Sequence, residues 1–294
     1  MTEAVGAIAA LWRFPVKSML GEQVDTAEVT ERGVVGDRAY ALIEAETGKV
    51  LSAKNPKLGP AMLNCRAEFT DLPRAGEEPP PVRITLPDGT SSTSDAPDVD
   101  AMLSGHLGRD VTLARAAPED FTIDQYHPDV EGLDPEGHRD TVTETKLGSA
   151  LFAGAGIPSA VPVGSFFDVF PVSVMTRSTL DQLNELRPES RFDERRFRMN
   201  VMVGTPDNGF VENDWVGRGL ELGDDVRLSI TVPDPRCVMT TQPQGDLPKD
   251  TEILRTLVRH NRLEVLGGPY PCAGVYATVA APGTIHAGDP AVVN

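Results

Sequence analysis

Short apolar runs, and runs in which apolar and polar residues alternate, occupy most of this 294-residue chain. Glycine, proline, asparagine or aspartate closes most of these runs, and that pattern predicts β-strands. The expected strands lie near residues 5–14, 24–30, 38–43, 49–52, 62–69, 82–86, 111–115, 166–174, 198–204, 220–232 and 274–280. Thr47-Gly48 and Asp88-Gly89 are typical of the hairpin turns that join such strands.

Helical spacing of apolar residues is rarer. It predicts helices over residues 98–107, 178–187 and 250–262. In the second of these, Ser178 and Asp181 are placed to form a capping box, and Pro188 ends the element. Many short strands with few helices predict an α+β fold that is predominantly β, with a barrel-like architecture.

Two segments lack either period. Residues 71–81 carry several prolines and acidic residues, which indicates an exposed excursion from the core. Residues 116–165 are rich in proline, glycine and acidic side chains, and we expect either a linker or a long surface excursion between two lobes.

The charge balance narrows the classes of partner. Asp and Glu number 44 against 27 for Lys and Arg, which gives a formal net charge of −17. Such a field repels nucleic acid and anionic membrane, so we expect neither as a partner. The apolar run near the N-terminus is broken by Arg13 and Pro15 and is too short for a signal peptide or a membrane span. A cytoplasmic protein is therefore expected.

The three cysteines, Cys65, Cys237 and Cys272, are widely spaced and form no C-x-x-C motif. That spacing argues against a disulfide framework and against a zinc or iron–sulfur site. We interpret Cys65 and Cys272 as packing residues because each lies in or near an apolar strand.

Cys237 stands apart, because it follows an expected strand and comes directly after Arg236. A thiolate is a soft metal ligand, and a neighbouring guanidinium favours the ionised sulfur. A lone cysteine is also often a small buried apolar residue, so both interpretations stay open at this point. Thr240 lies three residues further on and is a candidate for the same site.

Five arginines gather near residue 190 in this acidic chain. They are Arg187, Arg191, Arg195, Arg196 and Arg198. A solvated helix end, paired with nearby acids, and a pocket for an anion both explain such a cluster. Arg198 is the best pocket candidate, because alternation along the expected strand 197–201 puts Arg198 and Asn200 on one face.

Other polar groups occur where expected elements begin or end. Lys17 and Ser18 follow a proline that ends a strand, and Arg38 follows a tight turn at Gly36. At the start of the second helix, free backbone N–H groups favour an anion beside three polar residues, Thr176, Arg177 and Ser178. Capping of the helix would explain Ser178 equally well.

Several common site motifs are absent from the sequence. It contains no G-x-G-x-x-G, no G-x-x-x-x-G-K-[ST] and no G-x-S-x-G. The five histidines, at positions 106, 127, 138, 260 and 286, are scattered without the spacing of metal ligands, so we do not expect zinc-dependent hydrolysis.

Seven segments together resemble the MOSC superfamily, named for the C-terminal domain of molybdenum cofactor sulfurase. The resemblance is greatest to the subset that includes the mitochondrial amidoxime reducing component and its bacterial relatives. The segments are FPVKSMLG at 14–21, GDRAYALI at 36–43, FPVSVMTRSTLDQLN at 170–184, RFRMNVMV at 196–203, ENDWVG at 212–217, DPRCVMTT at 234–241 and PGTIHAGDPAVV at 282–293. They occur in the expected order and cover nearly the whole chain.

This resemblance implies a β-barrel-like N-terminal domain at 1–125 and a MOSC domain at 126–294. It also implies a molybdenum cofactor, a metal bound to molybdopterin and held by the sulfur of Cys237, and no pyridoxal phosphate. The residues that it places beside the cofactor are Lys17, Ser18, Arg38, Thr176, Arg177, Ser178, Arg198, Asn200, Arg236 and Thr240.

The resemblance further implies an oxidoreductase that acts on a small molecule, with N-hydroxylated or related N–O compounds as the expected substrates. Because the chain has no cluster cysteines, we expect electrons from a separate ferredoxin- or flavin-type protein, and we expect a monomer. Two alternatives stay open: a carrier that transfers the cofactor or sulfur, and an enzyme that cleaves C–S bonds. Loops such as 116–165 and 242–250 are expected to shape the substrate pocket.

Overall fold

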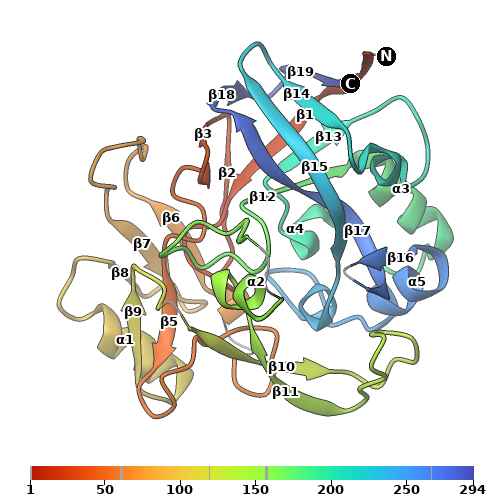
Figure 1. Cartoon of the computed structure of the whole chain (residues 1–294). Coiled ribbons are helices and arrows are strands. Elements are labelled where there is room, and N and C mark those ends of the chain that lie inside the picture. The colour runs from red at the N-terminus through yellow and green to blue at the C-terminus, as the bar shows by residue number, and fades with distance from the viewer. Residues whose placement is uncertain (1, 60–61, 119, 156–157, 266) are drawn as a thin grey trace.

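The computed structural model describes residues 2–59, 62–118, 120–155, 158–265 and 267–294. Its main feature is a closed β-barrel, beside which lies a lobe of smaller sheets (Figure 1). The barrel strands are β1 (Glu3–Arg13), β12 (Val172–Thr176), β13 (Val201–Gly204), β14 (Gly219–Leu222), β15 (Val226–Pro235), β17 (Gly268–Ala281) and β19 (Pro290–Val293). The predicted α+β, predominantly β class with barrel architecture is therefore confirmed.

The barrel closes through pairing between strands that are far apart in sequence. The strand order is β12-β13-β1-β19-β14-β15-β17, and β17 pairs back onto β12. The β12–β13 pair is parallel, and the other pairs of the ring are antiparallel. Since β1 comes from the N-terminal segment, it joins a ring whose other strands all come after residue 171. The division at 125/126 stays a prediction.

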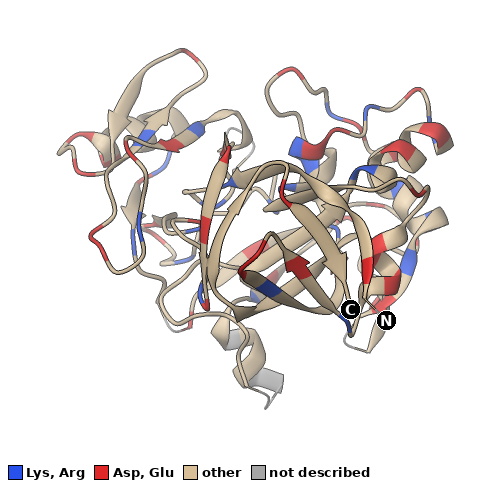
Figure 2. Ribbon diagram, turned by 90° about the horizontal axis from the view of Figure 1, so that it is seen from above, with Lys and Arg blue, Asp and Glu red and all other residues tan. Residues whose placement is uncertain are grey.

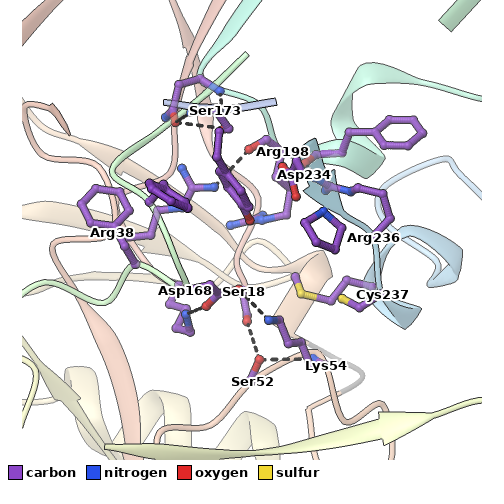
Figure 3. Close-up of a pocket in the computed structure, with 18 of the residues that line it drawn as sticks. Ser18, Arg38, Ser52, Lys54, Asp168, Ser173, Arg198, Asp234, Arg236 and Cys237 are labelled. Atoms are coloured by element: carbon purple, nitrogen blue, oxygen red, sulfur yellow. Dashed lines mark hydrogen bonds and ion pairs between the residues drawn. The ribbon is translucent and has the colours of Figure 1, made fainter. Parts of the chain in front are cut away.

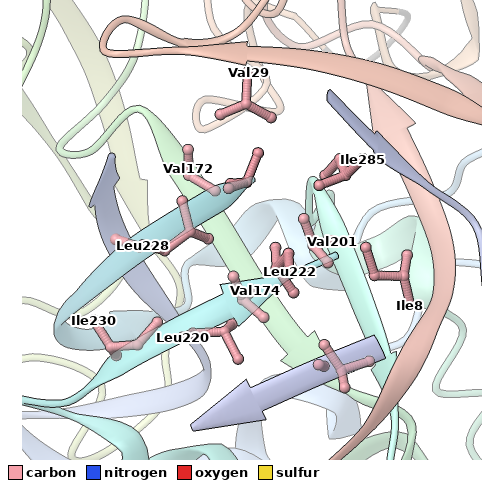
Figure 4. Close-up of a cluster of buried hydrophobic side chains, with 14 of the residues drawn as sticks. Ile8, Val29, Val172, Val174, Val201, Leu220, Leu222, Leu228, Ile230 and Ile285 are labelled. Carbon is pink, nitrogen blue, oxygen red and sulfur yellow. The ribbon is translucent and has the colours of Figure 1, made fainter. Parts of the chain in front are cut away.

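Aliphatic side chains fill the barrel, as Figure 4 shows for Ile8, Val174, Leu222 and Ile230. Along β15, Val226 and Leu228 are buried and alternate with more exposed residues, the two-residue period of a strand with one buried face. Full burial of each such side chain contributes about 1.5–3 kcal/mol. Gly6 is required in β1: its φ is +146°, and a Cβ there would lie 1.8 Å from the Gly204 carbonyl oxygen.

The smaller lobe is built mostly from the first half of the chain. Its strands are β5 (Ala41–Glu44), β6 (Arg66–Phe69), β7 (Val82–Thr85), β8 (Ser91–Thr93), β9 (Val111–Ala114), β10 (Thr122–His127) and β11 (Thr141–Lys146). Strands β3 (Thr26–Thr30) and β4 (Gly33–Val34) instead contribute Ala27, Val29 and Val34 to the core of the barrel. Near the C-terminus β18 (Gly283–His286) returns to pair with β3, while β2 (Glu22–Val24) and β16 (Arg262–Val265) pair with β1 and β17. A second apolar cluster, with Met19, Leu42, Ile84 and Leu103, forms the core of this lobe.

Helices lie on the outside of both lobes. They are α1 (Val99–Leu107), α2 (Ser149–Ala155), α3 (Arg177–Leu186), α4 (Glu194–Phe197) and α5 (Glu252–His260), with 3₁₀ turns η1 (Met62–Asn64), η2 (Val211–Trp215) and η3 (Val238–Thr241). None of the helices in the described part of the chain is long and apolar enough to cross a membrane. Seen from above, acidic residues are spread over both lobes (Figure 2).

The three predicted helices are confirmed as α1, α3 and α5, and residues 71–81 contain no helix or strand. The predicted cap of α3 is wrong: Thr176, not Ser178, is the N-cap, and its side chain accepts a hydrogen bond from the backbone N–H of Thr179. Region 116–165 is more ordered than predicted, because it holds the β10–β11 hairpin and α2.

One strand prediction is wrong, and four others began too early. The segment predicted as a strand over 49–52 forms only an isolated bridge at Val50. The strands predicted over 38–43, 62–69, 166–174 and 198–204 begin at Ala41, Arg66, Val172 and Val201. Arg198 instead has a left-handed backbone, with φ of 57°, at the end of α4. The expected strand face shared by Arg198 and Asn200 is therefore wrong, although both side chains reach the same cavity.

Candidate functional site

A cavity opens where one end of the barrel meets the smaller lobe (Figure 3). The segments that lead into β12 and β13 and the segments that follow β1 and β15 all contribute to its lining. Loops from distant parts of the sequence therefore converge on the cavity. About 750 Å³ of space lies among its lining atoms, part of it open to solvent. Its lining includes Lys17, Ser18, Arg38, Ser52, Lys54, Phe166, Phe167, Asp168, Phe170, Ser173, Arg196, Phe197, Arg198, Asn200, Asp234, Pro235, Arg236, Cys237, Met239 and Tyr276.

Cys237 lies just beyond the end of β15 and immediately before η3. Its carbonyl oxygen accepts hydrogen bonds from the backbone N–H of Thr240 at 3.2 Å and from the Thr240 hydroxyl at 3.0 Å, which fix the turn. Cys65 and Cys272 are buried, as predicted, and burial raises the pKa of their thiols to about 11 and about 12. Cys237 is partly exposed and lines the cavity, so it is the thiol placed to meet a ligand.

Arg236 is held beside Cys237 by an ion pair with Asp234 and by a hydrogen bond from Nη2 to the Phe197 carbonyl oxygen at 2.5 Å. Burial opposes the charge of Arg236, but the neighbouring Asp234 carboxylate keeps its pKa raised. Burial also raises the pKa of Asp234 to about 6, against the stabilising charge of Arg236. The buried Arg236 Nε has no hydrogen-bond partner among the described residues.

Two lysines in the cavity lining share one carboxylate. Asp168 pairs with Lys17, and its other oxygen lies 2.7 Å from Lys54 Nζ. Lys17 Nζ also donates to the Phe166 carbonyl oxygen at 2.8 Å. Burial acts against the ionised Asp168, but the two lysines outweigh it and hold the pKa of Asp168 far below its ordinary value. Burial lowers the pKa of Lys17, and Asp168 opposes this shift.

A third network joins the two arginines that line the cavity beside Phe14. Arg38 pairs with Asp37 and donates to the Arg198 carbonyl oxygen at 3.0 Å, and both guanidinium groups lie over the Phe14 ring, at 4.6 and 4.3 Å. Asn200 Nδ2 donates to Asp37 at 2.9 Å. Burial, and then the neighbouring Arg38, lower the pKa of Arg198 to about 9, which means that its charge lacks a full set of counter-charges.

The backbone is strained around the cavity. Among the described residues, four non-glycine residues have positive φ, and three of them, Ser18, Arg38 and Arg198, line the cavity. A left-handed backbone at a residue with a Cβ costs energy, and such residues cluster at functional sites. The strain is offset by the hydrogen bonds that place two of these side chains.

The structure brings seven of the predicted site residues to the cavity. They are Lys17, Ser18, Arg38, Arg198, Asn200, Arg236 and Cys237. The described lining does not include four others, Thr176, Arg177, Ser178 and Thr240.

Local structure explains where those four lie. Thr176 is buried as the cap of α3, and Ser178 donates to the Gly209 carbonyl oxygen at 2.9 Å. Arg177 is exposed and donates to the Ala9 carbonyl oxygen at 3.3 Å, while the Thr240 hydroxyl supports the turn at Cys237. We leave these four residues out of the cofactor site proposed below.

Some arginines of the cluster near residue 190 are solvated and paired with acids, and others line the cavity, so both interpretations of the cluster hold in part. Arg191 and Arg195 are solvated and pair with Asp193 and Asp246 on the surface. Arg196 lines the cavity, but its guanidinium donates to backbone carbonyl oxygens, including that of Pro248 at 2.8 Å. Arg198 has the position that an anion pocket requires.

Sequence reasoning missed Lys54, Asp168, Asp234 and Tyr276. Asp168 had a detectable signal, because it is the only charged residue in the aromatic run from Phe166 to Phe170. Lys54 and Tyr276 had no such signal in the sequence, because a lysine after a short apolar run and a tyrosine within a strand are both common. The cavity lining holds six lysine and arginine side chains and two carboxylates, an excess of four cations within a chain of net charge −17.

Comparison with known proteins agrees with this arrangement. The sequence matches the MOSC N-terminal beta barrel domain over residues 5–110 and the MOSC domain over residues 163–292. It is 26% identical over 306 residues to mitochondrial amidoxime-reducing component 1 of Homo sapiens, with 99% of this chain and 83% of that protein covered. Mitochondrial amidoxime reducing component 2 of Rattus norvegicus is 25% identical over 98% of this chain and 83% of its own length.

Among solved structures, the YUAD protein of Bacillus subtilis is similar with a TM-score of 0.43 and 12% identity, over 100% of this chain and 96% of that one. The sequence matches, which cover both lobes in order, identify the chain as a member of the MOSC superfamily, with a MOSC N-terminal beta barrel domain followed by a MOSC domain.

Proposed function

We propose that this protein is a molybdenum-cofactor oxidoreductase that reduces N-hydroxylated or related N–O compounds. The names of its curated relatives describe amidoxime reduction, which is chemistry of this class. The observation that carries the proposal is the position of the Cys237 sulfur in a cavity lined by an excess of lysine and arginine side chains.

The residues present fit a pterin cofactor that bears a phosphate and a soft metal. A thiolate suits the metal, and guanidinium groups suit the phosphate. Arg236 Nε is buried without a hydrogen-bond partner among the described residues, and Arg198 has a lowered pKa because burial disfavours its charge. Both groups would gain from an anion in the cavity.

In this proposal Cys237 holds the metal, and Arg38, Arg198 and Arg236 hold the anionic part of the cofactor. The bound cofactor supplies the two-electron chemistry that removes oxygen from the substrate. The protein's own residues orient both molecules and exclude water, while Asp168 fixes the positions of Lys17 and Lys54. We propose that electrons come from a separate ferredoxin- or flavin-type protein.

Metal analysis of Cys237→Ser tests the proposal. The purified parent protein is expected to carry about one molybdenum per chain and to reduce a test hydroxylamine, and Cys237→Ser is expected to lose both. Cys272→Ser is the matched control, because that thiol is buried away from the cavity and its hydrogen bond to the Tyr270 carbonyl oxygen can be kept by a hydroxyl.

Full molybdenum loading and activity in Cys237→Ser would overturn the assignment. A carrier and an enzyme differ in how firmly they hold the cofactor. An enzyme is expected to keep molybdenum through gel filtration and in the presence of an apo-acceptor protein. Complete transfer to the acceptor, without turnover of any N–O compound, would contradict the oxidoreductase.

A further inference from the structure

Outside the cavity, the fold brings together three metal-ligating side chains that are separated in sequence. His127 ends β10, and Asp134 and His138 lie in the connection that leads to β11. This hairpin lies at the end of the molecule opposite the chain termini (Figure 1). The histidines are eleven positions apart, which explains why their spacing along the chain gave no sign of a shared site.

The distances suit ligands of one small cation. One ligand atom from each of the three residues lies within 4.8 Å of those from the other two. Asp134 Oδ2 is 2.8 Å from His127 Nδ1 and 3.6 Å from His138 Nδ1. Tetrahedral zinc with bonds of about 2.0–2.1 Å places its ligand atoms roughly 3.3 Å apart, between these two separations.

The two oxygens of Asp134 are used differently. Oδ1 accepts hydrogen bonds from the backbone N–H groups of Gly137 at 2.7 Å and His138 at 3.2 Å, which shape the loop. Oδ2 is buried, and among the described residues its near neighbours are the two imidazoles, with His127 Nδ1 at 2.8 Å and His138 Nδ1 at 3.6 Å. The side chain is only 10% exposed, so this negatively charged atom points into the space between the two imidazoles.

The surroundings also match those of metal ligands. His127 Nε2 lies 2.9 Å from the Thr143 hydroxyl on β11, a contact that fixes the ring as second-layer hydrogen bonds do in metal sites. His138 is 33% exposed, which gives an ion a route from solvent. Glu136 Oε2 lies 3.4 Å from His138 Nδ1 and is available as a fourth ligand.

We propose that His127, Asp134 and His138 bind a divalent transition-metal ion of the zinc type. Two imidazole nitrogens and one carboxylate oxygen suit zinc, whereas Mg²⁺ and Ca²⁺ prefer sites built from oxygen alone. The site is separate from the Cys237 cavity, so the proposal does not depend on the proposed function.

An ion here would fasten the loop of the hairpin to the body of the protein. Val130 and Leu133 of that loop pack against Leu254 of α5. On the other side, β10 hydrogen-bonds to the segment that carries two cavity residues: the Val50 N–H donates to the Thr122 carbonyl oxygen at 3.0 Å, and the Tyr126 N–H to that of Lys54 at 2.9 Å. The ion would therefore stabilise β10, which hydrogen-bonds to the segment that carries Ser52 and Lys54, although the ion itself does not contact these two residues.

Zinc titration of the full, untagged chain after removal of metals tests the proposal. The experiment uses a Cys237→Ser background, so that the cavity thiol cannot take the ion. Asp134→Asn keeps Oδ1 as the acceptor that shapes the loop and removes the charge, and His138→Ala removes a partly exposed ligand. His260→Ala, an exposed histidine at the end of α5, is the matched control.

The Cys237→Ser parent and the His260→Ala control are expected to bind one zinc per chain, and zinc is expected to raise their melting temperature. Asp134→Asn and His138→Ala are expected to lose at least about tenfold in zinc affinity, since even second-layer changes cost 10–100-fold. Cobalt in place of zinc is expected to give the spectrum of nitrogen and oxygen ligands. The proposal fails if the parent binds no zinc, or if both variants bind it as tightly as the control.

Discussion

At the scale of single residues, the clearest consequence of the cavity concerns Asp168. Its carboxylate is the counter-charge for two lysines, the buried Lys17 and the largely buried Lys54. We expect Asp168→Asn to lower the free energy of unfolding by about 3–5 kcal/mol, because removal of one partner leaves buried charge without compensation. Asp124→Asn is the control, since Asp124 pairs with the more exposed Lys49; a loss under about 1 kcal/mol is expected there.

The effect of Asp168→Asn has a defined pH dependence. Lys17 and Lys54 hold the pKa of Asp168 far below its ordinary value, so its ionisation stabilises the fold above the unfolded-state pKa, about 4. As the pH falls below about 4, this contribution is lost, and the stability gap between the two proteins should narrow. Urea unfolding of the parent and of Asp168→Asn at pH 7 and at lower pH measures this difference in free energy of unfolding. A difference that stays constant with pH would contradict the role given to Asp168.

Single residues also show what the sequence could and could not reveal about the cavity. Arg198 and Cys237 were predicted because their types are unusual beside apolar strands. Asp168 and Lys54 form an ion pair, but they are more than a hundred positions apart in the sequence. Neither residue alone therefore predicts the pair. Thr176, predicted beside the cofactor, caps α3 and is not part of the described cavity lining; a helix cap and an anion site use the same residue types, so the sequence could not separate the two roles.

At the scale of secondary structure elements, Glu212 connects three of them. This fully buried carboxylate in η2 accepts hydrogen bonds from the hydroxyl of Thr176 at 2.6 Å, from Thr179 on α3 at 2.7 Å, and from the Gly274 N–H on β17 at 3.1 Å. We expect Glu212→Ala to destabilise the protein by roughly 3 kcal/mol or more, since each unsatisfied buried polar group costs about 1–3 kcal/mol.

Glu212→Gln is the matched variant, because its amide oxygen can still accept from Gly274 and the threonine hydroxyls can rotate to meet the amide. Burial raises the pKa of Glu212, so a neutral group at this position is tolerated. Thermal and urea unfolding should therefore rank the glutamine variant between the parent and Glu212→Ala. Equal loss in both variants would show that the charge of Glu212, rather than its hydrogen bonds, holds these elements together.

The boundaries of elements were the least predictable feature, for a physical reason. Residues 166–171 and 197–200 are apolar enough to resemble strands, and several of their side chains are buried. Their backbones nevertheless turn toward the cavity instead of continuing a ladder, as the left-handed Arg198 shows. Helices α1, α3 and α5 were predicted well because their apolar period is local and independent of the distant chain.

At the scale of the whole molecule, the predominantly β class followed from short apolar runs, but the order of the barrel strands did not. β1 pairs with β13 and β19, and these partners lie about 190 and 290 residues away along the chain. Such pairing is set by long-range packing of the aliphatic side chains in the barrel. The resemblance to a known family supplied what periodicity could not, and the residues of the cavity agree with it.

The same whole-molecule view shows two opposite electrostatic fields: a net charge of −17 and a cavity lined by an excess of cations. Added NaCl should therefore raise the melting temperature of the cofactor-free protein, because it screens repulsion among surface carboxylates; the Debye length falls from about 10 Å at 0.1 M to about 3 Å at 1 M. Inorganic phosphate at constant ionic strength should give a further rise, because the cavity cations attract it.

These two effects can be separated by Arg198→Gln, which removes one buried cation from the cavity and leaves the surface unchanged. The variant should keep the response to NaCl and lose most of the response to phosphate, as measured by thermal unfolding. In the parent, the phosphate increment should shrink as NaCl rises, since the same screening that relieves surface repulsion weakens attraction in the cavity. A phosphate response that survives unchanged in Arg198→Gln would place the anion elsewhere on the protein, and the cavity would then lack the affinity for anions that a pterin phosphate requires.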